Sequence, residues 1–184
     1  MKATGVVRRI DDLGRVVIPK EIRKTLRIKE GDPLEIFTDK EGEVILKKYS
    51  PIGELSEFAT QYAETLARTT GHIACITDKD TVIAVSGGSK KEFLEQGVSP
   101  ELEQVMEEKE SYLSQENNDV SIPITKNDNK ERKFNSQVVY PIIADGDVIG
   151  SVILLSKEPN TKMNEVEQKV VQSAANFLGS QMEI

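Results

Sequence analysis

The first fifty residues alternate short apolar runs with turn residues, which predicts small strands and one short helix. Gly14 closes an Asp12-Leu13-Gly14 segment where a left-handed turn is needed, and Pro19 suits the first turn of a helix. In chain order the pattern predicts strands over residues 2–9 and 15–18, a helix over 20–26, and a hairpin of strands 34–38 and 43–48.

From residue 51 onward the elements become longer, and the pattern is that of a mixed α/β domain. Ser50-Pro51 suits a helix start, and Asn164 followed by Glu167 forms the sequence pattern of a capping box. The predicted elements are a helix from 51 to about 69 ended by Gly71, strands 72–77 and 81–86, a helix 99–109, one or two strands within 112–124, a hairpin of 138–144 and 148–156, and a final helix from 164. The fold class is therefore α+β.

The N-terminal segment is too small to be comfortably stable alone. About fifty residues without a disulfide bury little apolar surface. Its apolar positions therefore need a partner, which an obligate dimer would supply. These positions are Val6, Val16, Ile18, Leu26, Leu34, Ile36, Val44 and Leu46.

Two predicted helices carry apolar stripes at helical spacing, and two interpretations are open for both. The stripes could pack into the core of their own chain, or they could pair with helices of other chains. The candidate oligomerisation residues are Leu55, Phe58, Tyr62 and Leu66 on the first helix, and Val170 and Phe177 on the last.

Charge divides the chain sharply. Residues 1–29 hold nine basic and three acidic side chains, a net charge of +6, although the whole chain carries −7. Residues 51–184 hold twelve basic and twenty-two acidic side chains, a net charge of −10. Such an asymmetry predicts that the N-terminal end binds a polyanion, and arginines on short strands beside a helix favour DNA. The alternative is a solvated basic face.

The candidate DNA-binding residues are all basic and lie before residue 25. Because neighbouring side chains on a strand point to opposite faces, only one of Arg8 and Arg9 can share a face with Arg15. Arginine and lysine contacts to phosphates would supply affinity, and a bidentate arginine–guanine contact would supply sequence preference. The full set is Lys2, Arg8, Arg9, Arg15, Arg23 and Lys24.

Little in the sequence favours an enzyme or a metalloprotein. The chain has one cysteine, Cys75, and one histidine, His72, so neither an intramolecular disulfide nor a multi-thiolate metal site is expected. No catalytic constellation, cofactor motif, signal peptide or membrane span is recognisable, which predicts a cytoplasmic protein. Gly87-Gly88-Ser89 could present backbone N–H groups to an anionic ligand, but it lacks phosphate-loop spacing and could be a plain turn.

The strings TGVVRRIDDLGRVVIPKEIRKTLRI, GDPLEI and VILKKY, within residues 1–50, closely resemble the AbrB-type swapped-hairpin DNA-binding family. The resemblance implies two chains that interleave their hairpins into one β-barrel-like dimer. It implies that Arg8, Arg15, Arg23 and position 24 face DNA at AT-rich, degenerate promoter sites, read partly by shape. Position 24 is Lys here, which keeps the charge but loses the bidentate fork.

The remainder resembles AbrB-type regulators of endospore-forming bacteria that carry a C-terminal GAF domain. The division is then residues 1–50 for DNA binding, 51–70 for a linker helix, and 71–184 for a GAF-like domain with a C-terminal oligomerisation helix. The resemblance implies an activator or repressor of forespore genes, and a homotetramer assembled through the helices flanking the GAF domain. Two rival hypotheses are an antitoxin-like DNA binder and a regulator whose GAF domain senses a small ligand.

Overall fold

The computed structural model describes residues 5–54, 56–115, 121–128 and 134–182. The chain separates into two compact units, Met1–Tyr49 and Ser50–Ile184, which are described in turn. Both helices and strands occur in each unit, so the fold class is α+β, as the sequence predicts.

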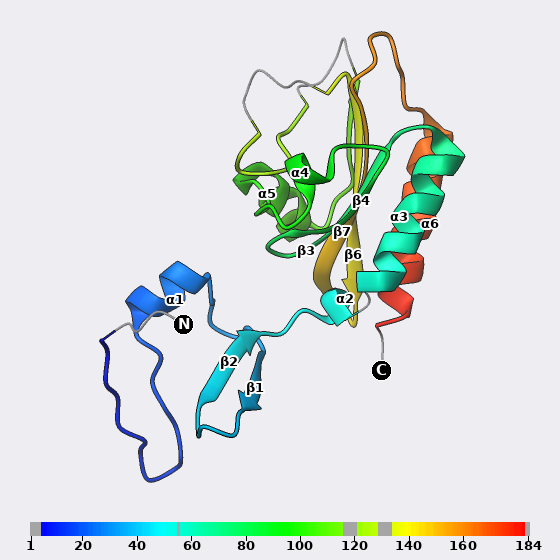
Figure 1. Cartoon of the computed structure of the whole chain (residues 1–184). Coiled ribbons are helices and arrows are strands. Elements are labelled where there is room, and N and C mark those ends of the chain that lie inside the picture. The colour runs from blue at the N-terminus through cyan, green and yellow to red at the C-terminus, as the bar shows by residue number, and fades with distance from the viewer. Residues whose placement is uncertain (1–4, 55, 116–120, 129–133, 183–184) are drawn as a thin grey trace. The chain divides into compact units, whose positions relative to one another are not determined.

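The N-terminal unit consists of a long loop, one short helix and one hairpin (Figure 1). Helix α1 spans Lys20–Leu26 and follows Pro19. Strands β1 (Leu34–Thr38) and β2 (Val44–Lys48) pair antiparallel, with Leu34 opposite Lys48 and Thr38 opposite Val44. Within this unit no residue from 5 to 49 is buried.

The strands predicted over residues 2–9 and 15–18 are wrong for the part of the chain that the structure describes, because residues 5–19 form an extended loop with a turn at 12–14. A strand needs a neighbouring strand to accept its backbone hydrogen bonds. Here the Asp11 N–H donates to the Arg15 carbonyl at 3.1 Å, which closes the turn without continuing into a ladder. Val7 and Val17 remain 85% and 72% exposed.

The second unit is built on one antiparallel sheet of five strands in the order β4-β3-β7-β6-β5. The central strand β7 pairs with β3 on one side and β6 on the other. The bounds are β3 Ile73–Asp78, β4 Val82–Ser86, β5 Tyr112–Gln115, β6 Ser136–Ala144 and β7 Asp147–Ser156.

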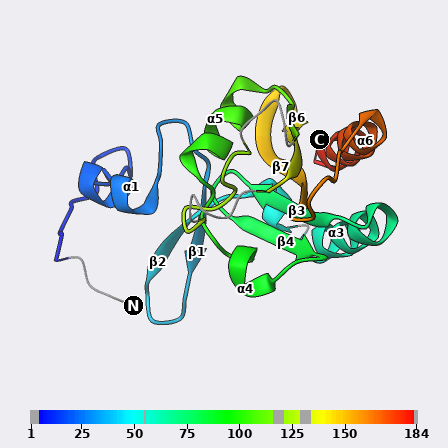
Figure 2. The same ribbon diagram turned by 90° about the horizontal axis from the view of Figure 1, so that it is seen from above.

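Helices cover both faces of this sheet and produce two apolar cores (Figure 2). Helices α2 (Pro51–Glu54), α3 (Ser56–Thr70) and α6 (Glu165–Ser180) pack on one face. Helices α4 (Lys90–Phe93) and α5 (Pro100–Glu108) pack on the other, where Phe93, Leu102 and Met106 are buried. The buried core of the described chain therefore lies entirely in the second unit.

Local signals in this unit are confirmed where the sequence predicted them. The Asn164 side chain accepts from the Val166 N–H at 2.7 Å, while Glu167 accepts from the Asn164 N–H at 2.8 Å, which makes the capping box of α6. Asp145 and Gly146 both have positive φ at the tip of the β6–β7 hairpin. Ser99 caps α5 by accepting from the Leu102 N–H.

Two features of this unit differ from the prediction, and one agrees with it. The short helix α4 was not expected, whereas the single strand β5 lies within 112–124, where one or two strands were predicted. The predicted stripe that includes Val170 and Phe177 is not the inward face of α6, because the face against the sheet consists of Val171, Ala174, Ala175, Leu178 and Gly179. Small residues on that face let the helix approach the strands closely, so the bulky Val166 and Phe177 lie off the core, 64% and 41% exposed.

Two glycines record how tightly this unit is packed. A Cβ atom on Gly150 in β7 would lie well inside van der Waals contact with the Thr77 carbonyl oxygen of β3. A Cβ atom on Gly179 would meet the Ile143 carbonyl oxygen of β6 in the same way. Both positions need glycine because backbone, which cannot rotate aside, fills the space.

Candidate nucleic-acid interface

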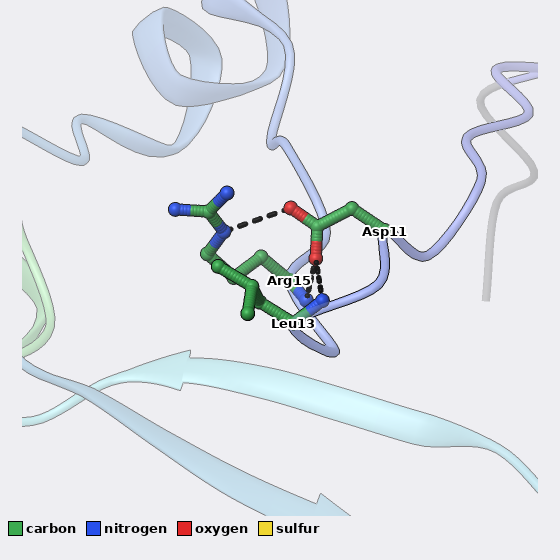
Figure 3. A network of polar contacts seen from close by, with 3 residues as sticks. All are labelled: Asp11, Leu13 and Arg15. Atoms are coloured by element: carbon green, nitrogen blue, oxygen red, sulfur yellow. Dashed lines mark hydrogen bonds and ion pairs between the residues drawn. The ribbon is translucent and has the colours of Figure 1, made fainter.

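The turn in the N-terminal loop is organised by one carboxylate, that of Asp11 (Figure 3). Its Oδ1 accepts hydrogen bonds from the backbone N–H of Leu13 at 3.0 Å and of Arg15 at 2.7 Å. Its Oδ2 accepts from the Nε of Arg15 at 2.8 Å, which is also an ion pair. Asp11 therefore binds both the backbone of the turn and the arginine that follows it.

The Asp11 carboxylate is held in its charged form by these donors. The backbone N–H of Arg15 contributes most to lowering the pKa of Asp11 below its usual value of 3.8, and the Arg15 side chain contributes next. The arginine remains accessible, since 69% of its side-chain surface is exposed. The turn thus presents a fixed cation to solvent at neutral pH.

The two arginines before the turn are exposed and loosely held. Arg8 and Arg9 lie on the extended part of the loop. Nη1 of Arg8 donates a long hydrogen bond to the neighbouring Val7 carbonyl, at 3.5 Å. Long, exposed cationic side chains of this kind suit contacts with phosphates, which need charge more than fixed geometry. Lys2 lies outside the described residues.

Helix α1 carries the remaining predicted DNA-binding residues. Lys24 is exposed, whereas Arg23 is half-buried, and its Nε has no hydrogen-bond partner among the described residues. The helix ends at Arg27, whose φ of 54° is left-handed, and the Ile28 N–H returns to the Arg23 carbonyl at 2.8 Å. A helix of two turns is thereby given a defined end.

One lysine connects α1 to the hairpin. Lys48 Nζ on β2 donates to the Arg27 carbonyl at 3.3 Å and pairs with Asp32 Oδ2, also at 3.3 Å. Asp32 in turn accepts from the Lys29 N–H at 2.8 Å. Sequence analysis missed this anchor, because a lysine twenty-one residues from its partner gives no local signal.

Sequence analysis also missed Asp11, although a signal was present. Because residues 1–29 hold nine basic side chains, an acidic residue among them is readily interpreted as a partner that only balances their charge. Asp followed two residues later by Leu-Gly is, however, the composition of a turn in which an aspartate side chain accepts from the following backbone. The structure gives Asp11 that role and adds the contact with Arg15.

The predicted ligand loop has a structural explanation for its glycines. A Cβ atom at Gly87, where φ is +75°, would lie 2.8 Å from the His72 carbonyl, and one at Gly88 would lie 2.8 Å from Cγ2 of Ile73. Ser89 precedes α4, and its side chain makes no capping hydrogen bond there. Close packing of this loop against the start of β3 therefore already requires small residues.

The predicted oligomerisation residues divide into two groups. Leu66 is 4% exposed and packs in the core of its own chain, and Val170 is partly buried against the same core. Phe58, Tyr62 and Phe177 form an aromatic trio between α3 and α6, with ring centroids 5.8–6.1 Å apart, and Tyr62 of this trio also packs against that core. Phe58 remains 36% exposed. Leu55 lies outside the described residues.

The remaining candidates for chemistry are inert or isolated. Cys75 is fully buried in β3, and burial raises the pKa of its thiol far above the usual range. Among the described residues, no three His, Cys, Asp or Glu side chains are grouped to hold a metal ion. In the same part of the chain, each helix is too short or too polar to cross a membrane.

Two family models together match most of the chain. Residues 54–183 match the one described as stage V sporulation protein T C-terminal, transcription factor. Residues 7–54 match the one described as antidote-toxin recognition MazE, bacterial antitoxin. The boundary between the two matches lies close to the boundary between the two compact units.

Individual proteins show the same division. Stage V sporulation protein T of Bacillus subtilis (strain 168) is 55% identical over 183 residues, which cover 100% of this chain and 99% of that protein. Transition state regulatory protein AbrB of the same organism is 63% identical over 51 residues, 28% of this chain and 52% of that protein. The GAF domain from an Acinetobacter phosphoenolpyruvate-protein phosphotransferase covers 70% of this chain and 81% of its own, with a TM-score of 0.54 and 13% identity, a likeness of fold.

Proposed function

This chain belongs to the stage V sporulation protein T family, and from that premise we propose how it binds DNA and assembles. It is a transcription regulator of sporulation whose AbrB-like N-terminal unit binds DNA. The second unit has a GAF-like fold. The finer statements below concern the DNA contacts, the oligomeric state and the regulatory role.

We propose that two copies of the N-terminal unit interleave into one DNA-binding dimer. The support is the apolar surface that this unit leaves exposed in a single chain, where no described residue is buried. Val7, Ile10, Leu13 and Val17 are each at least 70% exposed. The loop over residues 5–19 has β-branched composition but no strand neighbour within its own chain, and a second copy would supply one.

The proposed DNA contacts are the basic residues that precede residue 25 in this unit. Arg8, Arg9, Lys24 and Lys2 would bind phosphates and set the salt dependence of the affinity. Arg15 and Arg23 would reach base edges, where a guanidinium can donate two hydrogen bonds at once. The observation that carries this proposal is Arg15, a 69% exposed cation fixed by Asp11 at the head of a turn. From the resemblance to the AbrB-type family we expect AT-rich, degenerate sites read partly by DNA shape, and Lys24, which lacks the bidentate fork, would contribute charge to them.

A test of this contact compares two single charge removals. Arg15→Ala should cost roughly 1–3 kcal/mol of affinity for AT-rich duplex DNA, measured by fluorescence anisotropy. The matched control is Lys169→Ala, which removes an exposed cation paired with Glu165 on α6 of the acidic unit. Equal affinities for the two variants, with folding intact by circular dichroism, would contradict the proposal.

We propose that the aromatic trio on α3 and α6 joins two dimers into a homotetramer. The trio is apolar and partly exposed, whereas Leu66 and Val170 face the chain's own core. Two DNA-binding dimers in one particle would raise avidity without any new DNA contact. Phe58→Ser with Phe177→Ser should halve the mass measured by light scattering, while a mass unchanged from that of the tetramer would contradict the interface.

The regulatory assignment follows the family. We propose that the protein acts in the cytoplasm of the forespore, as an activator or a repressor according to the promoter, and that it has no enzymatic activity. Ligand sensing by the second unit is a separate proposal, placed at Gly87, Gly88 and Ser89 without a cofactor. Melting temperatures across a panel of anionic metabolites test it, and the absence of any shift would overturn it.

The antitoxin hypothesis has one observation in its favour, the match of residues 7–54 to an antitoxin family model. Antitoxins commonly continue into a disordered segment that folds on a toxin. This chain continues instead into a packed unit that matches a transcription-factor model over 130 residues. We therefore propose the regulator, and co-purification of a stoichiometric toxin from the native host would favour the antitoxin.

A further inference from the structure

We propose that Asp11 is a positioning residue that fixes Arg15 so that its two terminal amino groups meet DNA together. Asp11 would then have two effects, because its charge lowers the affinity for any DNA and its contact with Arg15 raises discrimination between sequences. The inference rests on the proposed function, because it requires Arg15 to contact DNA. It adds an acidic residue to a site for which charge alone selects basic ones.

The first step is the geometry of the turn. Backbone hydrogen bonds close it in both directions, from the Asp11 N–H to the Arg15 carbonyl at 3.1 Å and from the Gly14 N–H to the Asp11 carbonyl at 3.0 Å. The Asp11 side chain adds two more backbone bonds, to Leu13 and Arg15. Five residues thus form a closed unit, and the base of the Arg15 side chain has a defined direction.

The second step concerns which edge of the guanidinium is used. A guanidinium can present Nε with one amino group, or its two terminal amino groups, to a pair of acceptors. Nε of Arg15 is already engaged by Asp11 Oδ2 at 2.8 Å. Figure 3 shows one terminal nitrogen on the same side of the guanidinium as the carboxylate and the other directed away from it, while the hydrogen bond to Asp11 is made by Nε. The edge left for DNA is therefore the terminal one, whose spacing suits guanine O6 and N7 or two phosphate oxygens.

The third step concerns the cost of binding. An exposed arginine samples many rotamers, and ordering it on DNA costs conformational entropy. Because the contact with Asp11 already restricts the 69% exposed side chain of Arg15, part of that ordering precedes binding. A restricted guanidinium adds most to the binding affinity where two acceptors match its direction. It adds least where phosphates lie at variable positions.

The fourth step is the charge of Asp11 itself. A carboxylate close to the DNA surface repels phosphates at every sequence, so it weakens specific and non-specific binding alike. Only the orientation of Arg15 distinguishes the two kinds of site. The proposed role therefore predicts that a substitution of Asp11 weakens binding to a specific site without weakening binding to non-specific DNA. A role in stabilising the turn alone predicts no such difference.

The substitution Asp11→Asn separates the positioning of Arg15 from the stabilisation of the turn. The side-chain oxygen of asparagine can still accept from the backbone N–H groups of Leu13 and Arg15, so the turn is retained. Its amide nitrogen is a donor and cannot accept from the Nε of Arg15. The matched control is Asp12→Asn, which removes the same charge one residue later. Asp12 has no hydrogen bond or ion pair with any other residue that the structure describes.

The experiment measures anisotropy of the full-length protein on two duplexes of equal length. One is a sequence selected by the wild-type protein from a random pool, and the other is a shuffled duplex of the same base composition. Asp11→Asn should weaken binding to the selected duplex on the order of tenfold and leave binding to the shuffled duplex unchanged or stronger. Asp12→Asn should strengthen both by the same factor.

A double-mutant cycle completes the test. In an Arg15→Ala background, Asp11→Asn should behave like Asp12→Asn, because no guanidinium is left to orient. The inference is overturned if Asp11→Asn changes the affinity for both duplexes by the same factor, or if it still changes the ratio of the two affinities without Arg15. If Arg15→Ala alone changes binding to neither duplex, the proposed function fails instead, so the two failures are distinguishable.

Discussion

The two units of this chain treat apolar side chains in opposite ways. In the second unit, residues such as Leu102, Leu154 and Leu178 are fully buried on the two faces of one sheet. In the N-terminal unit, none of residues 5–49 is buried, although valines, leucines and isoleucines are frequent there. The contrast teaches that the second unit completes its core within one chain, while the first leaves its apolar side chains exposed, as the proposed dimer requires.

Charge follows the same division. The N-terminal end carries a net charge of +6 over residues 1–29, and residues 51–184 carry −10. The acidic unit is repelled by DNA and the basic one is attracted to it, so the division of charge keeps the binding function in one place. DNA contact therefore falls to the unit that does not bury its own side chains within one chain.

The largest expected effect comes from a substitution in the N-terminal unit, whose apolar side chains are exposed in a single chain. Val17→Asp places an unpaired charge in the proposed dimer interface, which should cost about 3–5 kcal/mol and abolish dimers of the N-terminal unit together with DNA binding. Val166→Asp is the control, because Val166 is exposed to a similar extent, 64% against 72%, on the packed unit. Analytical ultracentrifugation at several concentrations distinguishes them, and intact dimers of the Val17 variant would contradict the comparison.

The next effect concerns the core of the second unit. Leu178→Ala removes a fully buried side chain from α6 and should lower the free energy of unfolding by about 2–5 kcal/mol. Because this core lies within one chain, the loss in the urea transition of that unit should not depend on protein concentration. Val166→Ala on the same helix should change little, and a comparable loss there would show that exposure does not separate the two positions.

A smaller effect tests the close approach of two strands. Gly150→Ala should destabilise the second unit by about 1–3 kcal/mol, because the added methyl group meets the Thr77 carbonyl and backbone must move. Gly97→Ala is the matched control, since its nearest neighbour would be Lys126 Cδ at 3.6 Å, an ordinary contact. Thermal melting of both variants gives the comparison, which fails if the two melting temperatures are equal.

The smallest expected effect is that of pH on the discrimination between selected and shuffled DNA, which should not change between pH 8 and pH 5.5. The folded-state pKa of Asp11 is lowered, so its contribution is complete above 3.8 and is lost only as pH falls below that value. The ratio of affinities for selected and shuffled DNA should therefore stay constant between pH 8 and pH 5.5, roughly two units above that pKa. A change in this ratio that Asp11→Asn removes would show that the carboxylate titrates in that range.

Patterns that are complete within a few residues predicted the structure well. The capping box of Asn164 and Glu167, the Ser99 cap and the Asp145-Gly146 hairpin tip all formed where expected. Each of these signals depends on backbone and side-chain groups that are neighbours in sequence. Contacts with distant parts of the chain therefore did not change these local structures.

Features that depend on a distant partner were predicted less well. Residues 5–9 and 15–18 have strand composition but no strand neighbour in their own chain. Periodicity alone could not separate the inward face of α6 from the outward one, so the exposed Phe177 was grouped with Val170, which packs against the core of its own chain. For the candidate site, charge identified Arg15, but only the geometry of the turn identified Asp11.

The central claim is that the basic residues of the N-terminal unit form the DNA-binding surface. Its most direct test is the affinity for duplex DNA across a salt series, for the wild type, Arg8→Ala and Lys169→Ala. We expect a steep negative slope of log affinity against log salt, shallower by about 0.9 for Arg8→Ala and unchanged for Lys169→Ala. A slope near zero, or equal slopes for the two variants, would contradict the account.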